Sequence, residues 1–337
     1  MTALGIRAVG AVTAVGEDAP ATVGSIFTDA QAFDPLATKA ANGRPVIGAA
    51  TPIPADVKGI DRLVMLGAYA LREAAGGLTQ GTEIGLAVCA PSEQDEEDLA
   101  GQAPAFLTRL AAEASVVLAP KASRVFSSGC KATIGALVFA QTMLRSRDLA
   151  AVCVLGVDSL VTKARLGKLL RSNSAPMERF IPGEGSAAIL LSRRLASDSL
   201  AILAGVGIGE EPSCRAQAQQ PNLGKGFISA IDKAVADTRL VKPAFAAVVH
   251  DLPVTGNEEL TWVEQCPAFR TEPGIHILSP AFSVGETGAA CGILSLVTLA
   301  FLIGGKEVTA PGLCLFASEN AYRGAAVLTP PPQARRK

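Results

Sequence analysis

Residues 126–140 read FSSGCKATIGALVFA, a short polar segment that leads into a run of small apolar residues. The run predicts a helix over 129–145, and an Ala/Val-rich strand is predicted at 151–157. Cys130 therefore lies at the first turn of the helix, where the positive end of the helix dipole favours a thiolate, and Lys131 adds a cation. This arrangement is typical of a cysteine nucleophile. A buried structural cysteine is the alternative, because cysteine is among the residues most often buried.

The composition is that of a large globular protein with an aliphatic core. The chain has 337 residues, of which 49% are hydrophobic but only 4% aromatic, and its formal net charge is -1. This balance excludes the strongly basic surface that nucleic-acid binding needs. The seven cysteines include no CxxC pair, which argues against a disulfide framework and against a metal site. A reducing compartment is therefore predicted, and because residues 1–7 lack the apolar core of a signal peptide we expect a cytoplasmic protein.

One stretch is nearly as apolar as a membrane segment. Residues 289–303 read AACGILSLVTLAFLI and carry no charge. The stretch is shorter than the roughly 20 residues that a bilayer span needs, and no basic flank sets an orientation. We therefore predict a buried core helix and no membrane span.

The predicted elements alternate between strands and helices. Strands are predicted at 9–15, 83–90, 151–157, 187–192, 201–208, 245–250, 275–279, 312–317 and 324–328, and helices at 21–30, 61–75, 106–114, 129–145, 224–238 and 287–303. Residues 31–58 and 159–182 are predicted to be irregular, and 92–98 to be a solvated loop or a helix start. Such alternation predicts parallel sheets with helices on both faces.

The second half of this pattern repeats the first. Each half contains a long helix of small residues after a turn with glycine, at Gly129-Cys130 in the first and Gly285-Glu286 in the second. The repeat predicts two related halves with a boundary near 194–201. Residues 1–195 contain the nucleophile, and residues 196–337 contain His250 and Glu286.

Several motifs, taken in order, resemble one family. They are AVGAVTAVG at 8–16, SGC at 128–130, LGVD at 155–158, FIPGEGSAA at 180–188, His250 followed by Asn257-Glu258, and SVGETGAACG at 283–292. Their order and spacing resemble those of the β-ketoacyl-acyl-carrier-protein synthases, the condensing enzymes of the thiolase superfamily, nearly end to end. The resemblance implies an α/β thiolase-like fold in which two duplicated βαβαβαββ-type halves form a layered αβαβα sandwich.

The resemblance also implies a site, with departures from the family pattern. Cys130 falls on the family's nucleophile and His250 on its first active-site histidine. Glu286 falls on the second active-site histidine, and Asp251 on the glycine that follows the first. A lysine of the family is replaced by alanine, and its C-terminal glycine turn by residues 318–324.

The predicted catalytic residues are Cys130, His250 and Glu286. Cys130 takes an acyl group from a thioester, His250 serves as hydrogen-bond donor or acid, and Glu286 activates the acceptor as a general base. An ionised Glu286 would repel a malonyl carboxylate, so decarboxylative condensation is predicted to be poor. Two alternatives stay open: Glu286 caps its helix, and His250 is a core residue. His276 and Glu184 are predicted to have structural roles.

Three functions remain open. The first is a β-ketoacyl synthase-like acyltransferase of fatty-acid or polyketide biosynthesis that uses an acyl carrier protein or a CoA thioester. The second is a catalytically weak or inactive thiolase-fold partner or adaptor subunit. The third, a degradative thiolase, needs a second thiol before a glycine-rich turn, whereas Cys314 is followed by Leu315-Phe316-Ala317. We expect no cofactor beyond a CoA- or phosphopantetheine-linked substrate, and either a homodimer or a heterodimer with a related synthase.

Overall fold

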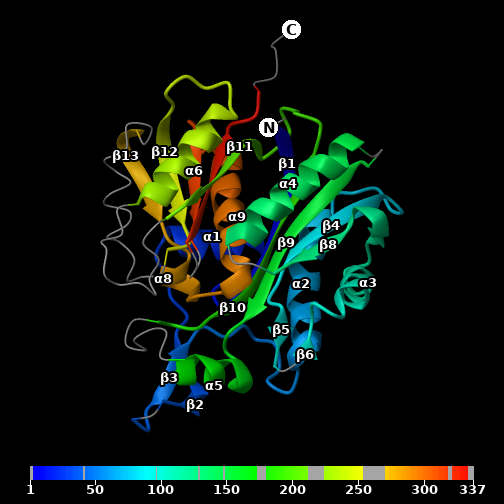
Figure 1. Ribbon diagram of the computed structural model, residues 1–337, viewed down its shortest axis with the longest axis vertical. Helices are drawn as coiled ribbons and strands as arrows, with labels where there is room; N and C mark the ends of the chain where they lie inside the picture. Colours follow the sequence, from blue (N-terminus) through cyan, green and yellow to red (C-terminus); the bar gives the residue numbers. More distant parts are fainter. Residues whose placement is uncertain are drawn as a thin grey trace.

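The computed structural model describes residues 3–40, 42–95, 97–127, 130–146, 149–172, 180–211, 224–252, 270–317 and 321–332, with 130, 172 and 270–273 described by their backbone alone. Within these residues, eleven strands form one large sheet that is covered and divided by helices (Figure 1). The strands are β1 (Leu4–Thr13), β4 (Glu83–Cys89), β7 (Val117–Leu118), β8 (Arg124–Phe126), β9 (Ala151–Ser159), β10 (Glu184–Ser192), β11 (Ala201–Glu210), β12 (Ala244–His250), β13 (Arg270–Leu278), β14 (Gly312–Phe316) and β15 (Tyr322–Thr329). The helices are α1 (Ala19–Phe27), α2 (Gly59–Ala75), α3 (Ala103–Glu113), α4 (Cys130–Ser146), α5 (Lys163–Ser172), α6 (Lys225–Ala236), α8 (Ala281–Val284) and α9 (Cys291–Gly304).

The two halves of the chain have the same strand order and the same strand directions. The order is β8-β4-β9-β10-β1 in the first half and β13-β12-β14-β15-β11 in the second. In the first half, β4 runs parallel to its neighbours β8 and β9, and β10 is antiparallel to both β9 and β1. In the second half, β12 runs parallel to β13 and β14, and β15 is antiparallel to both β14 and β11. The halves join where β1 pairs with β11 over residues 4–6 and 201–203. The predicted division after residue 195 falls between β10 and β11, and that the halves are separate domains remains a prediction.

The sheet is mixed, so the prediction of wholly parallel sheets is wrong. Two consecutive strands can pair in parallel only if the chain between them crosses back to the opposite end of the sheet. The chain instead leaves β9 and enters β10 at the same end, and does the same between β14 and β15. The layers are otherwise as predicted: α2 and α3 cover the first half, α6 covers the second, and α4 and α9 lie between them (Figure 1).

The contacts between the first strand of each half and its covering helix are repeated. Gly10 of β1 lies so close to α2 that a Cβ atom there would come 2.1 Å from the oxygen of Ala70. Gly207 of β11 approaches α6 in the same way, because its Cβ would come 2.0 Å from the oxygen of Ala230. Only glycine permits this approach, so the duplication extends to individual backbone contacts.

A side-chain contact next to each glycine is repeated with opposite charge. Glu73 of α2 accepts a hydrogen bond from the backbone N–H of Ala11 at 2.9 Å. Lys233 of α6 donates to the backbone oxygen of Ile208 at 2.7 Å. Both helical residues follow the alanine of the close contact by one turn, so they occupy equivalent positions in the two halves.

Helix α9 is buried on nearly every side, as predicted for residues 289–303. Its side chains at 292–300 are all buried, and only its ends and Phe301 are partly accessible. Its two hydroxyl groups bond within the helix, from Ser295 to the oxygen of Cys291 and from Thr298 to that of Leu294. Among the helices that the structure describes, none has both the length and the apolarity needed to cross a bilayer.

Two stretches predicted to be irregular, and one predicted to be a solvated loop or a helix start, contain short strands or a helix. Residues 31–58 hold the hairpin of β2 (Asp34–Lys39) and β3 (Pro45–Gly48), and 92–98 hold β5 (Glu93–Gln94) and β6 (Glu97–Asp98). Helix α5 lies within 159–182. Gln94 is fully buried and its Nε2 donates to the oxygen of Ser159, a tertiary contact that the acidic sequence conceals. Helix α5 buries Leu166 among basic neighbours that hide its apolar period.

A buried ion pair ties β10 to α2. Glu184 is fully buried, and Arg62 donates to both of its carboxylate oxygens at 2.7 and 2.6 Å. The hydroxyls of Thr51 and Ser159 and the N–H of Thr51 also donate to it. Burial alone would raise the pKa of Glu184, but the bonds and charge of Arg62 outweigh burial and lower the pKa. Glu184 therefore has a structural role, as predicted, and most of the hydrogen bonds to its carboxylate come from side chains.

Replacing Arg62 tests how much the ion pair of Arg62 and Glu184 contributes to the free energy of unfolding. Arg62→Met leaves Glu184 buried without its counter-ion and should cost about 3–5 kcal/mol in urea denaturation near neutral pH. The matched control is Arg109→Met, which breaks the exposed pair of Arg109 with Asp61 and should cost less than about 1 kcal/mol. The Arg62→Met deficit should shrink as pH falls through the lowered pKa of Glu184, because the natural chain then loses the pair. Equal costs for both variants would contradict this account.

Candidate functional site

The nucleophile predicted from the sequence begins the central helix α4. The helix starts at Cys130, within one residue of its predicted start. Ser128, Gly129 and the side chain of Cys130 lie outside the described part of the structure. The next residue, Lys131, places its Nζ 3.3 Å from the centre of the Tyr322 ring at the start of β15. The beginning of α4 therefore lies against the beginning of β15, and its charge is held there by a cation–π contact.

The first turns of the two central helices meet. A Cβ atom on Gly292, the second residue of α9, would come 2.4 Å from Oγ1 of Thr133 in α4. Cys130 and Cys291 begin these helices, so both helix starts lie at the same end of the central layer. Tyr322, in the C-terminal turn predicted at 318–324, reaches the same end, and 318–320 of that turn lie outside the described residues.

His250 ends β12 and is buried, with 3% of its surface exposed. Burial lowers its pKa to about 4, so the imidazole is neutral at pH 7, and its Nδ1 has no hydrogen-bond partner among the described residues. His250 pairs directly with Leu315 of β14, which packs with Val248 on the face covered by α6. Paired residues share a face of a sheet, so His250 lies on the α6 side.

Asp251 follows immediately and belongs to the opposite, central side. Its Oδ1 accepts a hydrogen bond from the N–H of Ala317 at 2.5 Å. Burial, together with a smaller effect of the negative charge of Glu286, raises the pKa of Asp251 to about 8, although the Ala317 bond and the charge of Arg323 oppose the rise. Asp251 is therefore mostly protonated at pH 7, and it is close enough to Glu286 for the two acids to interact.

Glu286 lies in the turn between α8 and α9 and is half-buried. Its N–H donates to the oxygen of Ile181 at 2.7 Å, and its oxygen accepts from the N–H of Gly183 at 2.9 Å. Gly285 makes this turn possible with a φ of 66°, a conformation that favours glycine. Since α9 begins only at Cys291, Glu286 does not occupy the N-cap position that was the alternative role for it.

Cys291 completes the group of Asp251 and Glu286. Its Sγ lies 3.3 Å from Oγ1 of Thr287. Burial raises the pKa of the Cys291 thiol, and the charges of Glu286 and Asp251 raise it further. Cys291 therefore stays a thiol at neutral pH, unlike the thiolate that a helix start favours in isolation.

The structure thus brings Glu286 together with Asp251 and Cys291, while His250 lies on the other face of β12. Sequence reasoning named Asp251 only as a departure from the family pattern and did not name Cys291 as a site residue. Because every residue of β12 from 247 to 250 is buried, the sequence shows no alternation that would tell which residue faces the centre. The available signal for Cys291 was its position, because it begins the central helix of the second half as Cys130 begins that of the first.

Two other predicted residues have structural surroundings. The ring of His276 in β13 packs against Phe27 of α1, with their centres 5.3 Å apart. Cys314 is fully buried in β14 and its Sγ lies 3.4 Å from the oxygen of Ser295, while burial raises its pKa well above the ordinary value. Neither environment is that of a reactive group. Among the described residues, no cluster of His, Cys, Asp or Glu has the composition of a metal site.

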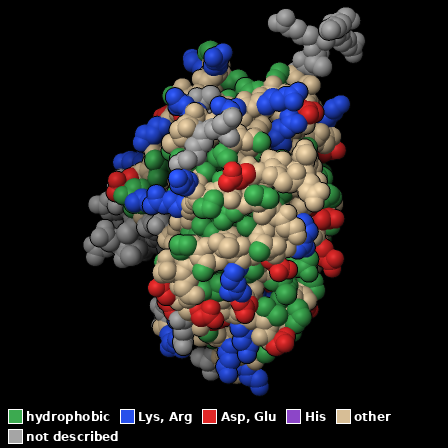
Figure 2. All heavy atoms as spheres, turned by 90° about the vertical axis from the view of Figure 1, so that its right-hand side faces the viewer, with side chains coloured by type: hydrophobic (Ala, Val, Ile, Leu, Met, Phe, Trp, Pro, Cys, Tyr) green, Lys and Arg blue, Asp and Glu red, His purple; other side chains and the backbone are tan. Residues whose placement is uncertain are grey.

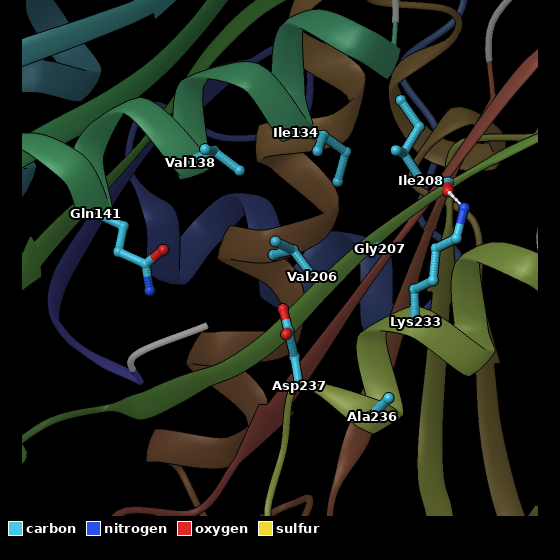
Figure 3. Close-up of a pocket in the computed structure, with 9 residues that line it drawn as sticks. All are labelled: Ile134, Val138, Gln141, Val206, Gly207, Ile208, Lys233, Ala236 and Asp237. Carbon is cyan, nitrogen blue, oxygen red and sulfur yellow. Dashed lines mark hydrogen bonds between the residues drawn. The ribbon is translucent and has the colours of Figure 1, made fainter.

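A groove of about 530 Å³ opens on the surface between α4 and α6, above β11 (Figure 3). Its lining residues are Ile134, Val138, Gln141, Val206, Gly207, Ile208, Lys233, Ala236 and Asp237. His250, Asp251 and Glu286 do not line it. Elsewhere, basic and acidic side chains share one face of the molecule and are separated by uncharged surface, in keeping with the small net charge (Figure 2).

Neither a family model nor a curated protein matches the sequence. Solved structures match its fold. A ketosynthase from module 6 of the bacillaene synthase from Bacillus subtilis 168 superposes with a TM-score of 0.74 at 11% identity, over 98% of this chain and 72% of that chain. An oxazolomycin ketosynthase domain from Streptomyces albus JA3453 gives 0.73 at 12%, over 99% and 75%. A keto synthase–chain length factor protein gives 0.73 at 15%, over 99% and 43%. The predicted thiolase-like fold is confirmed.

The raised pKa of Asp251 predicts a pH-dependent stability. The folded protein holds this proton more tightly than the unfolded chain, whose pKa is near 3.8, so stability falls as pH rises toward about 8. Asp251→Asn keeps an oxygen for Ala317 and removes the titration. Its melting temperature relative to the natural chain should therefore increase by about 3 °C or more between about pH 5 and about pH 9.

Asp198→Asn is the matched control. The bond from Arg7 lowers the pKa of Asp198, so its carboxylate is ionised throughout this pH range and the effect of its removal should not change with pH. A pH-independent effect of Asp251→Asn would mean that Asp251 is already ionised in the folded protein.

Proposed function

We propose that this protein is a ketosynthase-like acyltransferase that takes an acyl group from a CoA or carrier-protein thioester onto Cys130. The proposal rests on one observation above all: the first turn of α4, which carries Cys130, meets the first turn of α9 beside Glu286 and Asp251. A cysteine at the start of a central helix has the helix dipole that thioester chemistry uses.

The loading step follows from this position. The thiolate of Cys130 attacks the carbonyl carbon of the donor thioester, a new C–S bond forms, and the donor's C–S bond breaks to release the CoA or carrier-protein thiolate, which takes a proton from water. The helix N-terminus favours the thiolate form. Lys131 keeps a positive charge nearby through its contact with Tyr322. Backbone N–H groups at the helix start are candidates to stabilise the oxyanion.

Decarboxylative condensation is the poorer reaction in this proposal. Glu286 and Asp251 form an acid pair in which a negative charge on Glu286 raises the pKa of Asp251. That charge repels a malonyl carboxylate and the enolate that forms from it. Glu286 is proposed as the general base toward an uncharged acceptor. The role of His250 as donor or acid, the cytoplasmic location and the dimer remain predictions.

The same acid pair favours a second candidate, a thiolase-fold partner subunit without its own condensing activity. One of the similar structures is a keto synthase–chain length factor protein. Cys130 separates the two candidates, because a partner that only shapes another subunit's site does not need a nucleophile.

Intact-mass analysis after incubation with a series of acyl-CoAs and acyl carrier proteins tests the proposal. The natural chain should gain one acyl group, mapped by peptide analysis to Cys130, and Cys130→Ala should gain none. The matched control is Cys291→Ala, which removes the cysteine at the start of the other central helix and should still be loaded. If every donor fails to label the natural chain, the partner subunit is the better account.

Glu286→Gln tests the general-base role. Removing the base should slow acyl release from Cys130 by about tenfold to a hundredfold, while acyl loading changes by less than about twofold. Single-turnover mass measurements of the two steps provide the comparison. Equal effects on loading and release would assign Glu286 to the geometry of the site rather than to proton transfer.

A further inference from the structure

The connection between β9 and β10 contacts the Glu286 turn from two sides. Just before β10, Ile181 and Gly183 exchange backbone hydrogen bonds with Glu286, whose N–H donates to the first and whose oxygen accepts from the second. Near the end of β9, Asp158 accepts a hydrogen bond from the N–H of Ala289. The turn that carries Glu286 is therefore held between the two ends of one connection.

Asp158 lies directly against this turn and is buried, with 3% of its surface exposed. A Cβ atom on Gly288 would come 2.1 Å from Oδ2 of Asp158, and Gly288 has a φ of 53°, so glycine is required at this position. Oδ2 accepts the N–H of Ala289 at 2.9 Å, and Oδ1 accepts that of Ser159 at 2.8 Å. A change in the charge or the position of Asp158 therefore acts directly on the turn.

Arg165 of α5 supplies a positive charge to Asp158. Its Nη2 lies 3.5 Å from Oδ1 of Asp158, and among the described residues no other cation forms an ion pair with this carboxylate. Burial raises the pKa of Asp158, and the charge of Arg165 is the largest of the influences that oppose the rise. Arg165 therefore favours the ionised carboxylate, which accepts a stronger hydrogen bond from Ala289 than a neutral acid does.

Helix α5 lies at the end of the sheet where β9 ends and β10 begins (Figure 1). The residue before the helix, Thr162, donates from its hydroxyl to Oδ1 of Asp95 at 2.5 Å. Oδ2 of Asp95 in turn accepts the N–H of Gly59 at the start of α2 at 3.0 Å. Leu166 is the only buried side chain of α5 among those that the structure describes. These contacts fix the first turn of α5, which carries Arg165.

We propose that Arg165 is a positioning residue for Glu286: by pairing with Asp158, it holds the turn between α8 and α9 in place. The inference rests on the proposed function, because it takes Glu286 as the general base and adds a residue that acts on it through the backbone. Loss of the pair frees the N–H of Ala289 and lets the Glu286 carboxylate move from its position. A catalytic base that is displaced loses rate in the step that it serves and not in the others.

Amide hydrogen exchange tests the positioning without any acyl chemistry. In Arg165→Met, amides in peptides that cover 285–291 should exchange about tenfold faster than in the natural chain, because the hydrogen bond of Ala289 weakens. The matched control is Lys168→Met on the same helix, which breaks an exposed pair with Glu93 and should leave this exchange unchanged. Unchanged exchange in Arg165→Met, or an equal increase in both variants, would overturn the inference.

Two further variants test whether the effect comes from the charge of Arg165. Arg165→Lys keeps a cation at this position and should restore most of the slow exchange. Asp158→Asn removes the charge that Arg165 meets, so adding Arg165→Met to it should change the exchange by less than about twofold. A full effect of Arg165→Met in the Asp158→Asn chain would mean that Arg165 does not act through Asp158, and the inference would fail.

The rates of acyl loading and acyl release separate this inference from the proposed function. Arg165→Met should slow acyl release from Cys130 by about tenfold and change loading by less than about twofold, whereas Lys168→Met should change neither. If no donor loads the natural chain but the exchange pattern holds, the positioning of the turn stands and the acyltransferase is overturned. If loading occurs and Arg165→Met releases the acyl group at the natural rate, the acyltransferase stands and the role of Arg165 is overturned.

Discussion

Two helices can lie between the two halves of the sheet only where the facing residues are small, and this constraint fixes the centre of the molecule. A Cβ atom on Gly156 of β9 would come 2.9 Å from the Cα of Ala290, and one on Gly292 would collide with Thr133 of α4. Asp158, at the end of β9, accepts the N–H of Ala289 at 2.9 Å and so holds the start of α9 against the first half. Core packing therefore fixes the positions of the first turns of α4 and α9. The candidate site is rigid because it is built on these two helix starts.

The repeat is conserved in backbone geometry and diverges in charge. Gly10 and Gly207 permit the same close approach of a helix, yet the polar residue one turn along that helix is Glu73 in one half and Lys233 in the other. The acid receives backbone N–H groups from β1 and α1, whereas the lysine donates to a carbonyl of β11. Close packing tolerates few residue types, while polar contacts at the rim of each half accept either sign as long as a backbone partner of opposite polarity is available.

The sequence predicts the elements whose signals are local. Helix α2 and strand β4 are found within two residues of their predicted bounds, because each has a clear apolar pattern over its length. The mixed sheet and the β2–β3 hairpin depend on where the chain turns, which no local pattern records. The side of β12 on which His250 lies depends on its pairing with Leu315, so the family pattern identifies the end of the strand but not the residue that faces Glu286.

The acid pair is the strongest sign that the site has its own chemistry. Burying Asp251, and placing it close to Glu286, raises the pKa of Asp251 and costs stability at the pH where it ionises. Folding alone would favour a neutral residue at either position. Unfavourable electrostatics of this kind tend to persist where a reaction uses them. A malonyl acceptor would add a further negative charge to the pair, whereas an uncharged acceptor would add none. A charge that would oppose condensation is therefore compatible with the proposed acyl transfer from the helix start that lies beside it.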